Sequence, residues 1–241
     1  MSIFDVQSQC VEKLGFNPME VEQGSPEWHK ARMGVVTASN AICLLSSFDS
    51  DTFKTYVNKL VGQIITGRVP AEIKARSLQW GKDNEPGARR AFSVNNDLGL
   101  VTVKDIGFLY RDLDMRVGIS PDGHFVHDGI DYGLELKCPV AQDVYVDYAY
   151  RKDIKKSEIA QVQMSLWVTD WQSWYFAKYD PRVQLGPNCV STVIERDERM
   201  ISDLRGGYFE CRRRVDQLLG EYGIQFGDHY NIDYREECDD D

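Results

Sequence analysis

The segment 119–139 constrains the fold more than any other part of the chain. Within it, residues 134–137 read Leu-Glu-Leu-Lys, an alternation of apolar and charged residues. Successive side chains of a strand point to opposite faces, so Glu135 and Lys137 would share one face. The Asp-Gly pair at 128–129 is typical of a hairpin turn, and a hairpin centred near 129–130 would return Asp122 to the side of Glu135 and Lys137. The pattern therefore predicts two carboxylates and an amine at one place.

These three side chains have the chemistry that metal-dependent cleavage of a phosphodiester requires. Mg²⁺ prefers oxygen ligands and is usually held by one or two carboxylates, water and substrate phosphate. A bound metal polarises the phosphoryl oxygen and activates water, and a nearby lysine can orient the nucleophile. The alternative is that Glu135 and Lys137 form a solvated ion pair. Leucines on both sides of Glu135 indicate an internal strand, where charges rarely lack a function.

Eight short blocks in the chain, together with this motif, resemble the lambda exonuclease family of phage recombination nucleases. The superfamily pattern is Pro-Asp followed by Glu-x-Lys, which is typical of restriction-endonuclease-like, or PD-(D/E)XK, nucleases. The match runs from about Val21 to about Tyr230. It implies an α/β fold with a restriction-endonuclease-like core, a central mixed β-sheet flanked by helices. The blocks are Trp28–Gly34, Thr37–Ser39, Trp80–Lys82 with Glu85, Ser120–Gly123, Leu134–Pro139, Ala160–Gln163, Trp174–Ala177 and Tyr179–Arg182.

The resemblance implies an active site built from these blocks. Asp122 and Glu135 would hold Mg²⁺, two ions being expected and Mn²⁺ a possible substitute, together with the Leu136 carbonyl. Lys137 would position the attacking water with the help of Gln161.

Two further acids have open roles. Glu85 would bind or relay to a second metal by resemblance, although its residue type also suits a surface acid in the first turn of a helix. Pro86 is comfortable only near a helix start, so this helix should begin close to Asp83. Glu158 stands where we expect the family to carry tyrosine, and it could add a weak metal contact.

DNA contacts are expected from two other stretches. Arg32, Ser39 and Ser120 would form a pocket for a 5′-phosphate, because a guanidinium beside hydroxyls at a helix start suits an anion; helix capping plus a surface arginine is the alternative. Lys74, Arg76 and Leu78 would contact DNA, with Leu78 either a wedge against a base step or a buried contact.

The charge distribution bears on the same question. The net charge is −10, yet residues 54–90 hold eight Lys or Arg against three acids. This basic segment should face the duplex, because phosphate neutralisation supplies most sequence-independent affinity. Residues 233–241 hold six acids and one Arg, which predicts a solvated, disordered tail and leaves an interaction role as the alternative.

Composition limits the class of protein. With 241 residues, 42% of them hydrophobic, residues 1–232 should form one nuclease domain with a helical appendage at the amino end, although two small domains are an alternative. No apolar run could span a bilayer, so we expect a cytoplasmic protein, in the host cell if phage-encoded. The six cysteines, at positions 10, 43, 138, 189, 211 and 238, include no Cys-x-x-Cys pair and should be free thiols.

Hydrophobic periodicity supplies the element order. Helices are predicted at 3–14, from Pro26 to a stop at Gly34, from Thr37 or Ser39, at 53–65, 83–95, from a Ser157 cap to 169, and at 197–222; strands are predicted at 101–110, 116–119, 132–140, 174–178 and 190–195.

The function expected from the resemblance is Mg²⁺-dependent 5′→3′ digestion of one strand of double-stranded DNA from its ends, which releases mononucleotides and leaves 3′ single strands for recombination. A homotrimeric ring around DNA and a phage single-strand annealing protein as partner are also implied. Two rivals stay open: an endonuclease on the same fold, and a non-catalytic protein that binds DNA ends.

Overall fold

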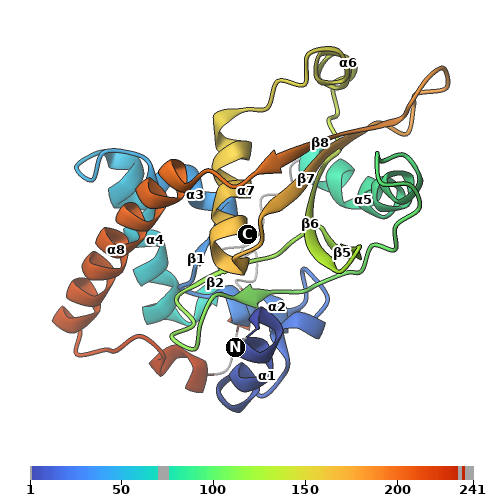
Figure 1. Ribbon diagram of the computed structural model, residues 1–241. Coiled ribbons are helices and arrows are strands. Elements are labelled where there is room, and N and C mark those ends of the chain that lie inside the picture. The colour runs from blue at the N-terminus through green and yellow to red at the C-terminus, as the bar shows by residue number, and fades with distance from the viewer. Residues whose placement is uncertain (1, 70–75, 233–234, 237–241) are drawn as a thin grey trace.

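The computed structural model describes residues 2–69, 76–232 and 235–236, and helices and strands alternate along them (Figure 1). None of the described helices has the length and apolar character needed to cross a membrane. The helices are α1 (Ile3–Leu14), α2 (Pro26–Arg32), α3 (Ala41–Leu44), α4 (Asp51–Thr66), α5 (Arg76–Val94), α6 (Gln142–Arg151), α7 (Lys156–Thr169) and α8 (Glu198–Glu221), with short 3-10 turns η1 (Pro18–Glu20), η2 (Ala38–Asn40) and η3 (Asp228–Asn231).

The central sheet has the strand order β5-β6-β7-β8 and is mixed, as the sequence predicts. β6 runs parallel to β7, whereas β5–β6 and β7–β8 are antiparallel. Smaller sheets pair β1-β4-β3 and β2-β9. The strands are β1 (Val36–Thr37), β2 (Arg68–Val69), β3 (Leu109–Tyr110), β4 (Val117–Ile119), β5 (Gly123–His127), β6 (Ile130–Lys137), β7 (Ser173–Tyr179), β8 (Cys189–Glu195) and β9 (Arg235–Glu236).

The predicted hairpin is confirmed. His127 pairs with Ile130, so Asp128 and Gly129 form a two-residue loop, and both have positive φ angles, of 50° and 77°. A loop with two positive φ angles matches the twist of the flanking strands, which is why Asp-Gly suits it. The loop fixes the register of β5 against β6.

The two faces of the central sheet are covered by different helices (Figure 1). α5 packs on one face, where Leu134 and Leu136 join Ala88 and Phe92 in an apolar cluster. α7 lies on the other side, in the largest cluster of the molecule, together with Trp174 and Phe176. Alternate residues of β6 therefore meet different helices, and those between the leucines face α7.

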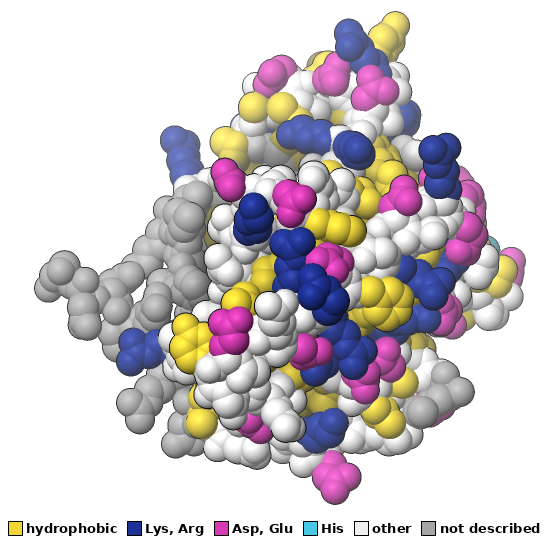
Figure 2. All heavy atoms as spheres, turned by 90° about the vertical axis from the view of Figure 1, so that its left-hand side faces the viewer, with side chains coloured by type: hydrophobic (Ala, Val, Ile, Leu, Met, Phe, Trp, Pro, Cys, Tyr) yellow, Lys and Arg dark blue, Asp and Glu magenta, His cyan; other side chains and the backbone are white. Residues whose placement is uncertain are grey.

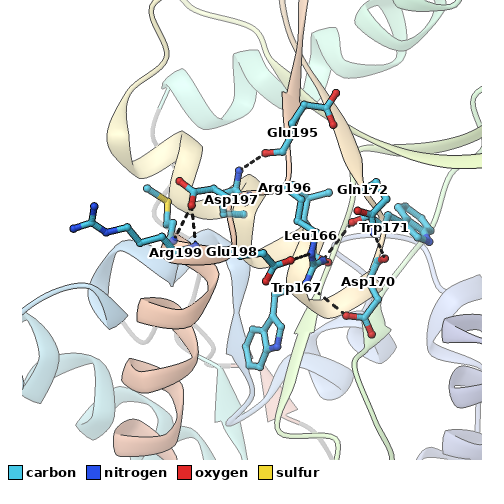
Figure 3. Close-up of polar contacts among 12 residues, drawn as sticks. Leu166, Trp167, Asp170, Trp171, Gln172, Glu195, Arg196, Asp197, Glu198 and Arg199 are labelled. Carbon is cyan, nitrogen blue, oxygen red and sulfur yellow. Dashed lines mark hydrogen bonds and ion pairs between the residues drawn. The ribbon is translucent and has the colours of Figure 1, made fainter.

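The carboxyl end of α7 is held by two arginines. Arg196 donates to the Leu166 carbonyl over 2.6 Å and to the Trp171 carbonyl over 3.3 Å (Figure 3). Arg111 donates to the Trp167 carbonyl. The last carbonyls of a helix lack helical partners, and cations are favoured at this end of its dipole. These contacts fix α7 to the loop before β7 and to the start of α8.

Several predicted boundaries are wrong. α5 spans Arg76–Val94 and so does not begin near Asp83, and Pro86 lies inside it. Pro86 is exposed, so the loss of one helical hydrogen bond is tolerated at the surface. The stretch 101–110 is strand only at Leu109–Tyr110, apart from a single bridge at Lys104.

Other differences concern helix starts and the tail. The segment after Thr37 opens as β1 and η2, not as a regular helix. α7 is preceded by Lys155 in the cap position, so Ser157 does not cap it, and α6 was not expected. Of the acidic tail, residues 235–236 form β9, which pairs in parallel with β2; residues 233–234 and 237–241 lie outside the described part.

Candidate active site

Glu135 is the centre of a polar group on the α7 side of the sheet. Its side chain is 2% exposed, and its Oε1 accepts a hydrogen bond from Lys137 Nζ over 2.5 Å and one from Gln161 Nε2 over 2.7 Å. Lys137 comes from the same face of β6, and Gln161 from α7. The structure thus brings together three of the residues that the sequence selects.

Asp122 lies in the link between β4 and β5, beside the same stretch of β6. Its Oδ2 accepts a hydrogen bond from the Leu136 backbone N–H over 2.7 Å, and its own N–H donates to the Leu134 carbonyl. The predicted return of Asp122 to Glu135 and Lys137 is therefore what the hairpin produces. The Leu136 side chain meanwhile packs on the α5 side.

The pKa values of both carboxylates are raised by the folded environment. Burial is the main cause that raises the pKa of Asp122 to about 6 and that of Glu135 to about 7, and the charge of Asp122 further raises the pKa of Glu135. Burial by itself lowers the pKa of Lys137, but Glu135 and Asp122 outweigh it and raise that pKa above its usual value. Lys137 is therefore a cation.

The donor set fits Mg²⁺. Within the described ranges, hydrogen bonds reach Oδ2 of Asp122 and Oε1 of Glu135, and the second oxygen of each carboxylate has no hydrogen-bond partner. Those ranges contain no group of three His, Cys, Asp or Glu side chains arranged to hold a metal. A pair of carboxylates is what Mg²⁺ usually takes from a protein, with water and phosphate completing its shell.

Glu85 is held by a residue that the sequence interpretation missed. Arg89 pairs with Glu85 over 2.5 Å, contacts Asp105, and donates from Nε to the backbone carbonyl of Asp122 over 2.8 Å. Glu85 and Asp122 are thus linked through one guanidinium. Burial raises the pKa of Glu85 although Arg89 opposes it. The spacing of four between Glu85 and Arg89 was the only available sign of this pair.

Glu158 has a structural contact. Its Oε2 accepts a hydrogen bond from the Lys155 N–H over 3.1 Å, at the amino end of α7. An acid in the first turn satisfies a free N–H and suits the helix dipole. The carboxylate thus caps the helix.

The proposed 5′-phosphate residues are partly brought together. Arg32 donates to Ser120 Oγ over 2.9 Å, and the Trp28 indole N–H, which sequence reasoning did not single out, donates to the same oxygen over 2.8 Å. The guanidinium of Arg32 also stacks 3.9 Å from the centre of the Trp28 ring. Ser39 lies in η2, where its hydroxyl contacts that of Thr37 over 3.2 Å.

A cavity of about 400 Å³ lies between these two groups of residues. Its lining includes Trp28, which contacts Ser120, together with Pro121 and with Glu85 and Arg89 of α5. It provides a space next to both the candidate phosphate pocket and the acidic centre.

The two described residues of the expected DNA-contacting set are exposed on α5. Arg76 is exposed at the first described residue of α5, Leu78 is 42% exposed, and Lys74 lies outside the described residues. The basic segment 54–90 does not form one surface in the described part of the chain, because α4 and α5 lie on opposite sides of the molecule (Figure 1). That this segment faces the duplex stays a prediction.

The face over α4 and α8 is not strongly basic either. Figure 2 shows Lys and Arg side chains there interspersed with Asp and Glu. On α8, Arg213 and Arg214 pair with Glu210, and Arg212 pairs with Asp114. Such pairs leave little net charge to attract phosphate.

Comparison with known proteins shows the family to which this chain belongs. A family model described as the YqaJ-like viral recombinase domain matches residues 27–172, which include Arg32, Glu85, Asp122, Glu135 and Gln161. The chain belongs to this family. The ExoD protein of Escherichia coli (strain K12) is 41% identical over 78 residues, which are 32% of this chain and 87% of ExoD.

Solved structures agree with the family. LHK-Exo, an alkaline exonuclease from Laribacter hongkongensis solved in complex with dAMP, is 25% identical, with a TM-score of 0.69 over 83% of this chain and 98% of LHK-Exo. A phage-related exonuclease from Haemophilus somnus 129PT is 15% identical and has a TM-score of 0.60 over 78% and 96% of the two chains, which shows the shared fold. The predicted lambda exonuclease family and restriction-endonuclease-like fold are confirmed.

Proposed function

We propose that this protein is a Mg²⁺-dependent exonuclease that digests the 5′ strand of linear double-stranded DNA, releases mononucleotides and leaves 3′ single strands for recombination. The observation that carries the proposal is the convergence of Asp122, Glu135 and Lys137, in a chain whose family and fold are those of exonucleases. Bound Mg²⁺ would polarise the scissile phosphate and activate water.

Each side chain of the site has a separate role in the proposed reaction. Asp122 and Glu135, with the Leu136 carbonyl, would hold the metal, and Arg89 links Glu85 to the backbone of Asp122 beside them. Lys137 holds the attacking water near Glu135 and offsets charge that develops on the phosphate. Gln161, from α7, donates to the same oxygen of Glu135 as Lys137 and so helps to fix the orientation of that carboxylate.

The 5′ direction rests on the pocket around Ser120. Arg32 is held by the Trp28 ring and by Ser120, so its guanidinium is oriented before substrate arrives. A guanidinium in a fixed position suits a terminal phosphate, which accepts paired hydrogen bonds. With the cavity between this pocket and Asp122, a strand anchored by its 5′ end would place its first phosphodiester near the metal.

The test is digestion of linear duplexes labelled at either end, with and without a 5′-phosphate, in Mg²⁺. Release of 5′-mononucleotides from the phosphorylated 5′ end supports the proposal. Cleavage of a covalently closed circle would instead identify an endonuclease, and binding of ends without product would identify a DNA-end-binding protein. The proposal includes a homotrimer around the duplex, which sedimentation would reveal, and an annealing protein as partner in the host cytoplasm.

A further inference from the structure

Lys178 is a buried lysine one strand away from Lys137. It pairs in register with Lys137 across the parallel strands β6 and β7. Residues paired in this way point to the same face of a sheet, and neighbouring strands lie about 4.8 Å apart. Lys178 is therefore on the face that carries Glu135 and Lys137, not on the face covered by α5.

The ammonium of Lys178 is buried and has no direct partner among the described residues. The residue is 4% exposed, and in the described part of the chain its ammonium has no hydrogen bond or ion pair. Instead, Nζ lies 4.9 Å from the centre of the Tyr148 ring and 5.8 Å from that of Phe176. Burial lowers the pKa of Lys178. A buried charge is costly unless a partner is present, so this position favours an anion.

The surroundings select the class of anion. Glu158 and Asp147 act on Lys178 as opposite charges, and Lys155 and Lys137 act on it as like charges, so the nearby lysines offset the nearby acids. α7 also begins here, since Gln161, which reaches Glu135, is only five residues after its first residue, Lys156. The amino end of a helix supplies free N–H groups and favours negative charge. A phosphate group of DNA fits this combination.

We propose that Lys178 binds the phosphate that neighbours the scissile phosphate on the strand being degraded. The inference rests on the proposed function and adds a binding residue to it. The phosphates of one DNA strand follow one another about every 3.4 Å along the helix axis, so a lysine one strand beyond Lys137 is spaced to meet the next one. The hydrogen bonds that Glu135 accepts come from Lys137 and Gln161, and neither of them involves Lys178.

The first experiment measures affinity for linear duplex against salt concentration, in Ca²⁺ to suppress cleavage. Each phosphate neutralised on duplex DNA contributes about −0.9 to the log–log slope. Lys178→Met, which keeps the length of the side chain, should flatten the slope by about that amount and weaken binding roughly tenfold. Lys178→Arg should restore both.

Lys152→Met is the matched control. Lys152 also lies near the Tyr148 ring, at 5.5 Å, but it is exposed and its Nζ contacts the Ser191 carbonyl over 3.4 Å. Its replacement should leave the slope unchanged. If Lys178→Met had the parental slope while its melting temperature fell, Lys178 would be a packing residue and the proposal would be wrong.

A second measurement identifies the phosphate. Duplexes carrying a single neutral methylphosphonate next to the scissile position should bind the parent weakly, and they should bind Lys178→Met no worse than ordinary DNA does. Equal losses in both proteins would overturn the assignment. Lys178→Gln serves in the same comparison if the Met variant does not fold. DNA binding in Ca²⁺ is measured without cleavage. If the unmutated protein bound DNA in Ca²⁺ but did not degrade it in Mg²⁺, the proposed function would be refuted, whereas the role of Lys178 in binding phosphate would still be tested by the salt dependence.

Discussion

The backbone N–H of Leu136 donates a hydrogen bond to Oδ2 of Asp122 over 2.7 Å. The main chain of Leu136, between Glu135 and Lys137, thus orients the Asp122 carboxylate. The Leu136 side chain packs towards α5. Strand register, not a flexible side chain, sets the distance between the two carboxylates. A slip of one residue in β6 would remove both charged side chains from the site.

Removing the charge of Glu135 and removing that of Lys137 should have different effects on Mg²⁺ binding but similar effects on the rate. Glu135→Gln should lower the rate of nucleotide release by about a hundredfold or more and weaken Mg²⁺ binding, because a ligand charge is lost. Lys137→Met should lower the rate similarly but keep or strengthen Mg²⁺ affinity, since an ammonium is no ligand. Calorimetric Mg²⁺ titration and a rate assay test both. A Glu135→Gln protein with parental rate and affinity would contradict the assignment.

Metal binding should depend on pH with a definite sign. Folding raises the pKa values of Asp122 and Glu135, mainly by burial, to about 6 and about 7. Their protonated forms are thus favoured by folding, and this stability is lost as the pH rises through these values. Mg²⁺ competes with the protons, so it should raise the melting temperature more at about pH 8 than at about pH 5. An equal shift at both pH values would contradict this.

The phosphate pocket should decide which ends are digested. Arg32→Ala should lower the rate on 5′-phosphorylated ends roughly tenfold and change the rate on hydroxyl ends little, because the lost contact is charged. Lys30→Ala, also on α2, is the control and should retain the parental preference. The ratio of the two rates is the measurement, and an unchanged ratio in Arg32→Ala would mean that the 5′ end binds elsewhere.

Arg89 should act as a positioning residue. Arg89→Gln leaves Glu85 buried beside Asp122 without its cation and removes the bond to the Asp122 carbonyl. We expect a higher Mg²⁺ requirement and a pH–rate profile shifted upwards, because uncompensated acids hold protons more tightly. Arg90→Gln, on the exposed side of the same helix, should alter neither. A fall in melting temperature without a change in the pH profile would show a purely structural role.

Two adjacent glycines of α8 should respond oppositely to alanine. A Cβ at Gly207 would lie 2.1 Å from the Leu44 carbonyl oxygen, whereas one at Gly206 would meet nothing within 4 Å. Gly207→Ala should therefore lower the free energy of unfolding by about 2 kcal/mol or more. Gly206→Ala should raise it by about 0.5–1 kcal/mol, because alanine favours helix. Denaturant unfolding measures both.

The features that the sequence predicts correctly depend on residues that are neighbours in the chain. The alternation in β6 and the Asp-Gly loop depend only on neighbouring residues, so the shared face of Glu135 and Lys137 was predictable. Arg89 was missed because its contacts with Asp105 and Asp122 span 16 and 33 residues.

Lys178 could not be found from sequence for a similar reason. Its position beside Lys137 depends on the pairing partner and register of β7, which are settled by packing against α6 and α7. The predicted start of α5 is wrong because Pro86 lies at the exposed surface, where the helix tolerates the loss of one hydrogen bond.

The burial of α7 has a consequence for evolution. From Val162 to Thr169 every residue of the helix is buried, and arginines hold its final carbonyls. Gln161 therefore lies on a helix in which most substitutions would disturb the packing of the core. New substrate preferences would have to arise at the exposed surfaces of α2, α5 and α6, which can accept mutations one at a time while the helix behind the metal ligands stays the same.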